Sequence, residues 1–152
     1  MLKKLGGLLV AIIIAYIPGA IGNLVNPSSW YDSLDKPPLQ PPGWVFGVVW
    51  TILYIATGVA LYLIWRSKSS DKALAYVLFG VHMILNASWS LVFFGLQQPW
   101  FGLVVIVALL VTIALCIIHF QRISRWASWL FIPYLAWVAF ATYLNAGVAI
   151  LN

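Results

Sequence analysis

The sequence predicts an all-α integral membrane protein, folded as a bundle of five transmembrane helices. Of its 152 residues, 64% are apolar and 7% are charged, whereas a soluble domain typically carries about 25% charged residues. The apolar residues form five long runs that are separated by polar segments. Each run has the length of roughly 20 residues that an α-helix needs to cross a bilayer core of about 30 Å. We therefore expect a single transmembrane domain over residues 1–152, with the lipid bilayer as its partner.

The first apolar run covers residues 5–25 and follows Lys3 and Lys4. A basic start followed by an apolar run is also typical of a signal peptide. The run is longer than the apolar core of about 7–15 residues that signal peptides carry. We therefore interpret it as a retained first span, in which Gly19, Gly22 and Asn23 are small residues that another group could approach.

A long segment, residues 26–43, separates the first span from the second, which we expect at residues 44–65. Within it, "KPPLQPP" (residues 36–42, the proline strap) carries four prolines. Proline fixes its own φ and lacks an N–H donor, so the proline strap is predicted to be stiff and extended. A rigid segment loses little ordering entropy on binding, and we expect it to form a lid over one end of the bundle.

The remaining three spans are expected at residues 73–96, 100–120 and 127–151. The segments that separate them are "RSKSSDK", "QQP" and "QRISRW". Pro99 stands next to the start of the fourth span, where a missing N–H does least harm. Pro133 lies near the start of the last span and could bend it.

The basic residues predict the orientation of the bundle. With five spans, the N-terminus and the second and fourth loops lie on one side of the membrane. Seven of the eight basic residues belong to that side: Lys3, Lys4, Arg66, Lys68, Lys72, Arg122 and Arg125. Under the positive-inside rule the N-terminus is cytoplasmic, whereas the proline strap and the C-terminus are outside. The basic residues are thus explained by topology, and nucleic acid is not expected as a partner.

Charged groups are missing from the predicted membrane interior. Asp32, Asp35 and Asp71, which are all of the acidic residues, lie in loops. A charge in a span costs at least about 2.5–3.5 kcal/mol and usually marks a proton or cation relay, so the sequence argues against a proton-coupled antiporter. His82 and His119 are expected at different depths, and each is interpreted as an interior or interfacial histidine rather than a haem ligand. We expect no metal site, no obligatory cofactor and no familiar catalytic constellation.

Three of the spans carry aromatic and amide residues at helical spacing. The stripes are Phe46, Trp50 and Tyr54 in the second span, His82, Asn86, Trp89 or Ser90, and Phe93 in the third, and Trp137, Ala141 and Asn145 in the fifth. A buried amide needs a partner, which another helix or a ligand could supply. Buried indole N–H groups also need acceptors. Packing alone is one interpretation of these stripes, and a pocket for a flat aromatic ligand with polar edges is the other.

Three segments resemble the translocator protein family, also called TspO/MBR, tryptophan-rich sensory proteins or peripheral-type benzodiazepine receptors. They are "KPPLQPPGWVFGVVWTILY" (Lys36–Tyr54), "NASWSLVFF" (Asn86–Phe94) and "PYLAWVAFATYLN" (Pro133–Asn145). The resemblance implies a homodimer of five-helix bundles, with a pocket open toward the first loop. It also implies binding of protoporphyrin IX, other tetrapyrroles and isoquinoline carboxamide or benzodiazepine-type drugs.

The resemblance and the stripes together predict the ligand-binding residues. They are Tyr31, Trp44, Phe46, Trp50, Asn86, Trp89, Ser90, Phe93, Trp137, Ala141 and Asn145. Trp50 and Trp137 match the family's two pocket tryptophans, which are thought to act in light- and oxygen-dependent degradation of protoporphyrin. Whether this chain is an enzyme is left open. No basic residue is expected in the pocket, so porphyrin carboxylates would face the loop and water.

Two other functions stay open: passive translocation or export of small hydrophobic molecules, and a structural role in assembly without a ligand. Animal members of the family carry a sterol-recognition pattern with a basic residue at the end of the last helix. The corresponding tail here, "YLNAGVAILN", has no Lys or Arg. We therefore predict no sterol transport, and a location in a bacterial cytoplasmic membrane.

Overall fold

The computed structural model describes residues 2–25 and 28–152, and the described residues fold into helices. The elements are α1 (Leu2–Leu24), α2 (Ser28–Ser33), α3 (Gly43–Arg66), α4 (Lys72–Ser90), the π-helical turn η1 (Leu91–Gly95), α5 (Pro99–Phe120) and α6 (Arg125–Leu151). Five segments are long and apolar enough to cross a membrane. The predicted five-span bundle is therefore confirmed, and α2 and η1 are the elements that the sequence did not predict.

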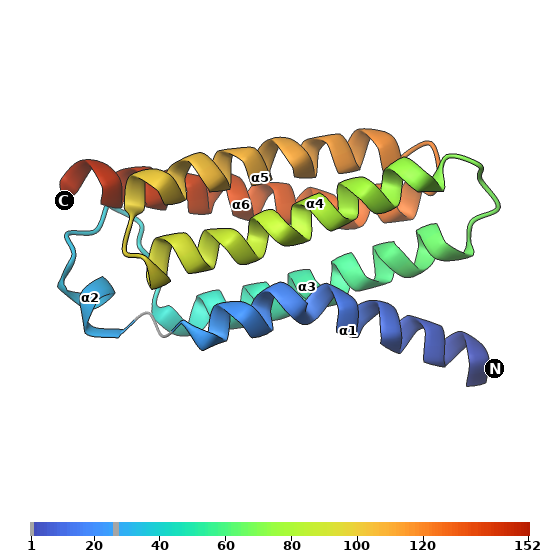
Figure 1. Ribbon diagram of the computed structural model, residues 1–152, viewed down its shortest axis with the longest axis horizontal. Coiled ribbons are helices and arrows are strands. Elements are labelled where there is room, and N and C mark those ends of the chain that lie inside the picture. The colour runs from blue at the N-terminus through green and yellow to red at the C-terminus, as the bar shows by residue number, and fades with distance from the viewer. Residues whose placement is uncertain (1, 26–27) are drawn as a thin grey trace.

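The long helices lie side by side along the bundle, as Figure 1 shows. α1 packs on α3, α4 packs on α5, and α5 packs on α6, while α3 and α6 join the two halves. α2, the proline strap and the C-terminus lie at one end, which we call the strap end. The N-terminus and the α3–α4 and α5–α6 connections lie at the opposite end. The termini and the connecting segments are thus divided between the two ends, as a chain that crosses the membrane five times requires.

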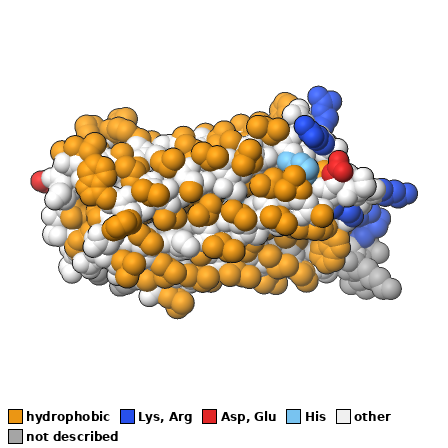
Figure 2. All heavy atoms as spheres, turned by 45° about the horizontal axis from the view of Figure 1, so that its top comes forward, with side chains coloured by type: hydrophobic (Ala, Val, Ile, Leu, Met, Phe, Trp, Pro, Cys, Tyr) orange, Lys and Arg blue, Asp and Glu red, His pale blue; other side chains and the backbone are white. Residues whose placement is uncertain are grey.

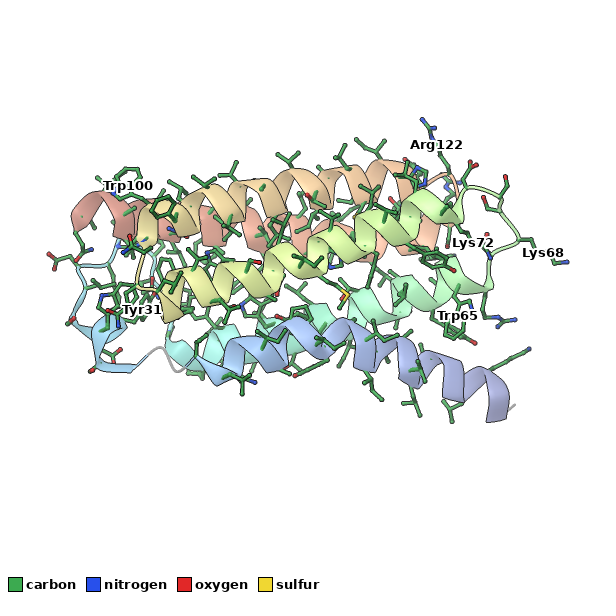
Figure 3. All side chains as sticks on the ribbon, in the orientation of Figure 1. Tyr31, Trp65, Lys68, Lys72, Trp100 and Arg122 are labelled. Carbon is green, nitrogen blue, oxygen red and sulfur yellow. The ribbon has the colours of Figure 1, made fainter. Side chains whose placement is uncertain are left out.

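The outer surface of the bundle suits a lipid environment. Large apolar side chains such as Ile13 and Val104 are 66% and 68% exposed, and apolar side chains cover the length of the bundle in Figure 2. Lys and Arg side chains gather at the end away from the strap; Figure 3 labels Lys68, Lys72 and Arg122 there. The side chain of Lys3 lies outside the described residues. The basic side chains thus gather at the end that carries the N-terminus, and the positive-inside rule predicts that this end is cytoplasmic.

Local signals explain where the helices begin and approach one another. Ser124 caps α6, because its hydroxyl accepts a hydrogen bond from the Ala127 N–H at 3.4 Å. Pro99 is the first residue of α5, a position at which its missing N–H is not needed. Gly58 lets α1 and α3 approach closely, since a Cβ there would lie 2.5 Å from the Ile12 Cα.

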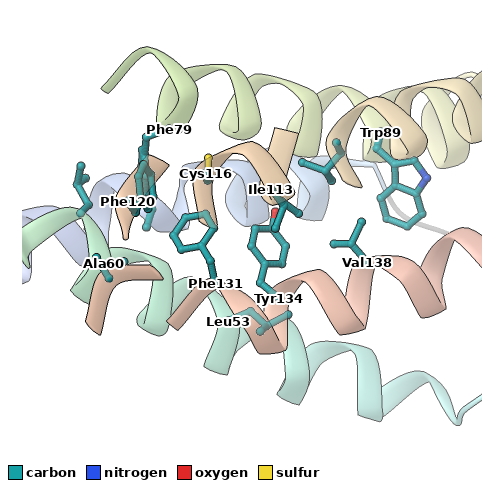
Figure 4. Packing of buried hydrophobic residues seen from close by; sticks show 14 of the residues in the cluster. Leu53, Ala60, Phe79, Trp89, Ile113, Cys116, Phe120, Phe131, Tyr134 and Val138 are labelled. Carbon is teal, nitrogen blue, oxygen red and sulfur yellow. The ribbon is translucent and has the colours of Figure 1, made fainter. Parts of the chain in front are cut away.

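The packed core lies between α4, α5 and α6, toward the end opposite the strap. Its buried rings contact each other edge to face: the centroids of Phe120 and Phe131 are 5.1 Å apart, and those of Phe79 and Phe131 are 6.3 Å apart. Cys116 is buried beside them (Figure 4). His82 is also enclosed there, with its ring 5.4 Å from Phe131. The core therefore fills the part of the bundle that lies away from the strap.

Candidate functional site

An open cavity of about 760 Å³ lies at the strap end of the bundle. Its walls come from the C-terminal half of α1, from α2, the proline strap and the N-terminal half of α3, and from the end of α4 with η1. The lining residues are Tyr16, Gly19, Gly22, Asn23, Val25, Tyr31, Asp32, Lys36, Gln40, Pro41, Gly43, Phe46, Gly47, Trp50, Thr51, Tyr54, Trp89, Ser90 and Phe94. Sites for small molecules typically have volumes of about 300–1,000 Å³. The cavity is therefore large enough for an organic ligand.

The deep part of the cavity is aromatic and closely fitted. Trp50 stacks on Tyr54, with the ring centroids 5.6 Å apart and the planes at 25°. Tyr16 packs on the same tyrosine at 5.1 Å, and its hydroxyl lies 3.0 Å from the Thr51 hydroxyl. Gly19 makes room for this arrangement, because a Cβ there would clash with the Tyr54 ring. This floor presents flat apolar faces with hydroxyl groups at their edges.

Asn86 is buried behind this floor, where it holds two tyrosines. Its carbonyl oxygen accepts a hydrogen bond from the Tyr54 hydroxyl at 3.0 Å, and its NH₂ group donates to the Tyr134 hydroxyl at 2.8 Å. The amide that the sequence predicts to need a partner thus finds two on neighbouring helices. Asn86 does not line the cavity, but it fixes the orientation of Tyr54, which does.

Asn145 plays a similar part for Trp89. The Trp89 indole N–H donates to the Asn145 side-chain oxygen at 2.9 Å, and the Asn145 NH₂ group donates to the Pro99 carbonyl at 2.8 Å. These bonds connect α4, α6 and the first residue of α5. They fix the indole face that Trp89 presents to the cavity.

A second, much smaller cavity of about 20 Å³ lies beside the first. Phe46, Trp89, Phe93, Ala141 and Asn145 are among its lining residues. A volume of this size suffices for about one water molecule. Three predicted site residues (Phe93, Ala141 and Asn145) contact this space rather than the large cavity.

The π-helical turn η1 closes the α4 side of the large cavity. The sequence predicts that the third helix continues regularly to residue 96, but the Leu96 N–H bonds to the Leu91 carbonyl at 2.8 Å, five residues back. The extra residue per turn changes the direction of the side chains that follow Ser90. Phe94 lines both cavities, while Phe93 lines only the small one. Turns of this kind occur frequently at functional sites.

The proline strap is fastened to the end of α6. Pro37 is buried against Gly147, where any Cβ would lie 2.5 Å from the proline ring. The Tyr143 hydroxyl donates to the Pro38 carbonyl at 3.1 Å. The Asn152 side chain accepts from the N–H of Asp35 and donates to its carbonyl, both at 3.0 Å. The expected lid is therefore, in this structure, an anchored rim beside an open cavity.

The expectation of a pocket without a basic residue is wrong, because Lys36 lines the cavity. The anchored strap turns this lysine back over α2. Its ammonium group donates to the carbonyls of Asp32 at 3.2 Å and Leu34 at 3.4 Å, and it lies 5.0 Å from the centre of the Tyr31 ring.

Tyr31 completes the polar side of the cavity mouth. Its hydroxyl accepts a hydrogen bond from the Gln40 NH₂ group at 2.9 Å. Burial raises the pKa of the Tyr31 phenol, the hydrogen bond from Gln40 opposes that rise, and the negative charge of Asp32 adds to it. The phenol therefore stays neutral and can donate a hydrogen bond.

The structure brings five of the predicted site residues to the large cavity: Tyr31, Phe46, Trp50, Trp89 and Ser90. Trp44, Asn86 and Trp137 lie outside both cavities in the described part of the chain. Trp44 is 70% exposed at the start of α3. Trp137 contacts the ring of Phe46 at 5.6 Å, and its buried indole N–H has no acceptor among the described residues. A role for these residues with a ligand stays a prediction.

Several lining residues were missed by the sequence reasoning. Tyr16 and Thr51 belong to helix faces that no stripe singled out, and Phe94 depends on η1. Lys36 had a usable signal, because it is the one basic residue that the topology prediction places on the outside. Within the described residues, no group of three His, Cys, Asp or Glu side chains could hold a metal ion.

Comparison with known proteins covers almost the whole chain. The model of the TspO/MBR family matches residues 8–151. "Tryptophan-rich protein TspO" of Chlorobaculum tepidum is 45% identical over 130 residues, which cover 84% of this chain and 82% of that protein. The protein of the same name from Archaeoglobus fulgidus is 36% identical over 152 residues, covering 100% and 98%. The human "Translocator protein" is 38% identical over 119 residues, covering 76% and 70%.

Proposed function

The chain belongs to the TspO/MBR family, and we propose that it is a membrane receptor or scavenger that binds protoporphyrin IX or a related tetrapyrrole in the large cavity. The observation that carries this proposal is the combination of volume and wall. A space of about 760 Å³ is bordered by the aromatic rings of Trp50, Tyr54 and Trp89 and opens at the strap end. Flat aromatic ligands pack favourably on such ring faces.

The same wall supports binding of isoquinoline carboxamide or benzodiazepine-type drugs. These molecules combine aromatic rings with a few hydrogen-bond acceptors. The hydroxyl groups of Tyr16 and Thr51 and the amide of Gln40 supply polar groups around the apolar faces. A largely apolar pocket with a small number of polar groups is the usual composition of a small-molecule site.

Light- and oxygen-dependent degradation of the bound porphyrin is a further part of the proposal. Trp50 lines the cavity and stacks on Tyr54, so its indole would lie next to a bound macrocycle. Trp137 would contribute only through Phe46 or after a change of position. Loss of bleaching of bound protoporphyrin in the Trp50→Phe, Trp137→Phe double variant would support this activity, and unchanged bleaching would rule out the role of the indoles.

Passive translocation is the second candidate function, and the name "Translocator protein" of several relatives favours it. The packed core argues for reception instead. Phe131 and Tyr134 are 0% and 2% exposed between the cavity and the opposite end of the bundle, so passage through the bundle would have to open this core. Flux of protoporphyrin into proteoliposomes, measured with and without the protein, separates the two functions.

Titration of the purified protein with protoporphyrin IX tests reception directly. Trp50 and Trp89 line the cavity, so we expect saturable quenching of tryptophan fluorescence. Quenching that rises linearly without saturation would overturn the proposal and favour a structural role in assembly.

The protein is an integral membrane protein, and its arrangement in the cell is part of the proposal. The basic side chains at one end of the bundle support a cytoplasmic N-terminus and an external proline strap (Figures 2 and 3). Similarity to bacterial and archaeal relatives supports a prokaryotic cytoplasmic membrane. A homodimer is proposed on the family resemblance alone.

A further inference from the structure

We infer that Lys36 binds the anionic group of the ligand, so that the cavity selects flat aromatic molecules that carry a carboxylate. This inference rests on the proposed function, because it concerns the ligand of the same cavity. It assigns to the proline strap a role in recognition in addition to its role as the rim.

The cavity has an apolar floor and a polar mouth. The floor consists of the stacked rings of Trp50 and Tyr54. The mouth contains Lys36, Gln40 and the hydroxyl group of Tyr31, all contributed by α2 and the segment after it. A ligand with an aromatic body and a polar end fits this division in one orientation, with its polar end at the strap.

The ammonium group of Lys36 has donor capacity left for such a ligand. It carries three N–H donors, and its partners are neutral: two backbone carbonyls and the face of the Tyr31 ring. The side chain is half-buried. A cation without a carboxylate partner among the described residues is free to form a charge-assisted hydrogen bond with an anion, which is stronger than a bond between neutral groups.

Asp32 also lines the cavity and works against an anionic ligand. Its backbone carbonyl holds Lys36, whereas its carboxylate belongs to an exposed side chain. Because the Asp32 side chain is more exposed than that of Lys36, water screens its negative charge more. The positive charge of Lys36 therefore outweighs the negative charge of Asp32 for an anion bound at the lysine. Removal of the Asp32 charge should strengthen this preference.

The anchoring of the strap prepares Lys36 for this role. Pro37, the next residue, is buried against Gly147, and Asp35, the preceding residue, is bonded to Asn152. The backbone on both sides of the lysine is thus fixed before a ligand arrives, which reduces the entropy lost on binding. The topology signal does not account for this residue, because basic residues are favoured at the opposite end of the bundle.

The test compares protoporphyrin IX with its dimethyl ester, which keeps the ring and removes both carboxylates. The unmodified protein in detergent is titrated with each, and tryptophan quenching is followed at low and high salt. We expect the diacid to bind about five- to tenfold more tightly than the ester. This gain in affinity lies between the gains expected from an exposed and from a buried charge pair. We also expect salt to weaken only the binding of the diacid.

Variants then assign the preference to one residue. Lys36→Gln should bring the affinity for the diacid down to that for the ester, while Asp32→Asn should raise it. Lys68→Gln, at the opposite end of the bundle, is the matched control and should change neither affinity. Size-exclusion profiles and circular dichroism report whether each variant is folded.

The outcomes separate this inference from the proposed function. Saturable binding of both compounds with equal affinity to the unmodified protein would overturn the role of Lys36 and leave the receptor function standing. Binding of neither compound would overturn the receptor function and this inference with it. The comparison of the two compounds needs no variant, so a misfolded Lys36→Gln protein would not prevent the decision.

Discussion

Two aromatic clusters lie along the same bundle, and they differ in what borders them. The core cluster consists of Phe79, His82, Phe120, Phe131 and Tyr134, all at most 4% exposed. The cavity cluster consists of Tyr31, Trp50, Tyr54, Trp89 and Phe94, all of which line the large cavity. Figure 4 shows Trp89 lying apart from Phe79, Phe120 and Phe131. Aromatic composition alone therefore does not create a pocket.

The difference comes from the neighbouring helices. The core cluster comes from α4, α5 and α6, and other buried apolar side chains of these helices, such as Ile113, belong to the same packed cluster. The cavity cluster faces α1 at Gly19 and Gly22, which present no side chain. It is bordered at the end of the bundle by the short helix α2 and the anchored strap instead of by another long helix. The glycines let Tyr54 and Ser90 approach α1 closely, and the rim at the strap, in place of a packed helix end, leaves the volume open.

Asn86 connects the two clusters. It accepts a hydrogen bond from Tyr54 in the cavity cluster and donates one to Tyr134 in the core cluster. A change in the core could thus reach the cavity wall through this amide. The comparison therefore predicts that the clusters respond differently to substitution, with Asn86 as the residue that affects both.

The largest expected effect is on stability, from truncation in the core cluster. Phe131→Ala removes a fully buried ring that contacts Phe79, His82 and Phe120. We expect a loss of about 3–5 kcal/mol in the free energy of unfolding, measured by denaturation in mixed micelles. The molecules that remain folded should bind protoporphyrin with unchanged affinity. A large loss of affinity in the folded fraction would show that the clusters are not separable.

The next largest effect is on binding, from truncation in the cavity cluster. Trp50→Ala removes an indole that lines the cavity, and we expect a loss of about 2 kcal/mol of binding free energy, the size typical of a central aromatic anchor. This corresponds to a roughly thirtyfold higher Kd for protoporphyrin. Titration by quenching of the remaining tryptophans measures it.

Trp137→Ala is the matched control, because this indole lies outside both cavities within the described chain. We expect its Kd to stay within about threefold of the unmodified protein. Equal losses in both variants would mean that Trp137 moves into contact with the ligand, as the family resemblance implies.

The spans could be predicted from the sequence because length and apolarity decide them. Each predicted end lies within two residues of the end of the corresponding membrane-spanning segment, although helix α1 itself begins at Leu2, three residues before the predicted start. The cavity-facing residues were harder to predict. Trp50 and Trp137 have the same chemistry at similar expected depth, and only the rotation of each helix against its neighbours separates them.

Two other features depend on interactions between distant segments. Lys36 lines the cavity because contacts of the strap with Gly147 and Asn152, more than 100 residues later, fix its path. No local pattern predicts those contacts. Phe93 and Phe94 are directed by η1, which interrupts a sequence that reads as a regular apolar helix.

A smaller effect is expected where the strap meets α6. Gly147→Ala would place a Cβ 2.5 Å from the Pro37 ring, and two backbone-constrained groups cannot easily move apart. We expect a loss of about 1–2 kcal/mol of stability, typical of overpacking. Because the rim would then be less firmly held, protoporphyrin should also dissociate faster, which stopped-flow displacement measures. Gly80→Ala, at a glycine inside α4 with open space around it, is the control: it should show no loss of stability, only the gain from the higher helix propensity of alanine, and no change in dissociation.

Asn86→Leu tests whether the two clusters are coupled, with a small expected effect on each. The substitution keeps the approximate volume and leaves the hydroxyls of Tyr54 and Tyr134 without their partner. Hydrogen bonds between membrane helices contribute about 0.6 kcal/mol on average, so we expect a stability loss of about 0.6 kcal/mol for each bond and a weakening of binding of less than about threefold.

The triple variant Asn86→Leu, Tyr54→Phe, Tyr134→Phe removes all three polar groups together. Because an unsatisfied buried hydroxyl is more costly than an absent one, it should recover part of the stability that Asn86→Leu loses. Recovery of stability without recovery of affinity would assign the effect on binding to the Tyr54 hydroxyl at the cavity edge. Loss of all binding in Asn86→Leu at unchanged stability would contradict this account, because the amide would then contact the ligand itself, and the two clusters would form one site.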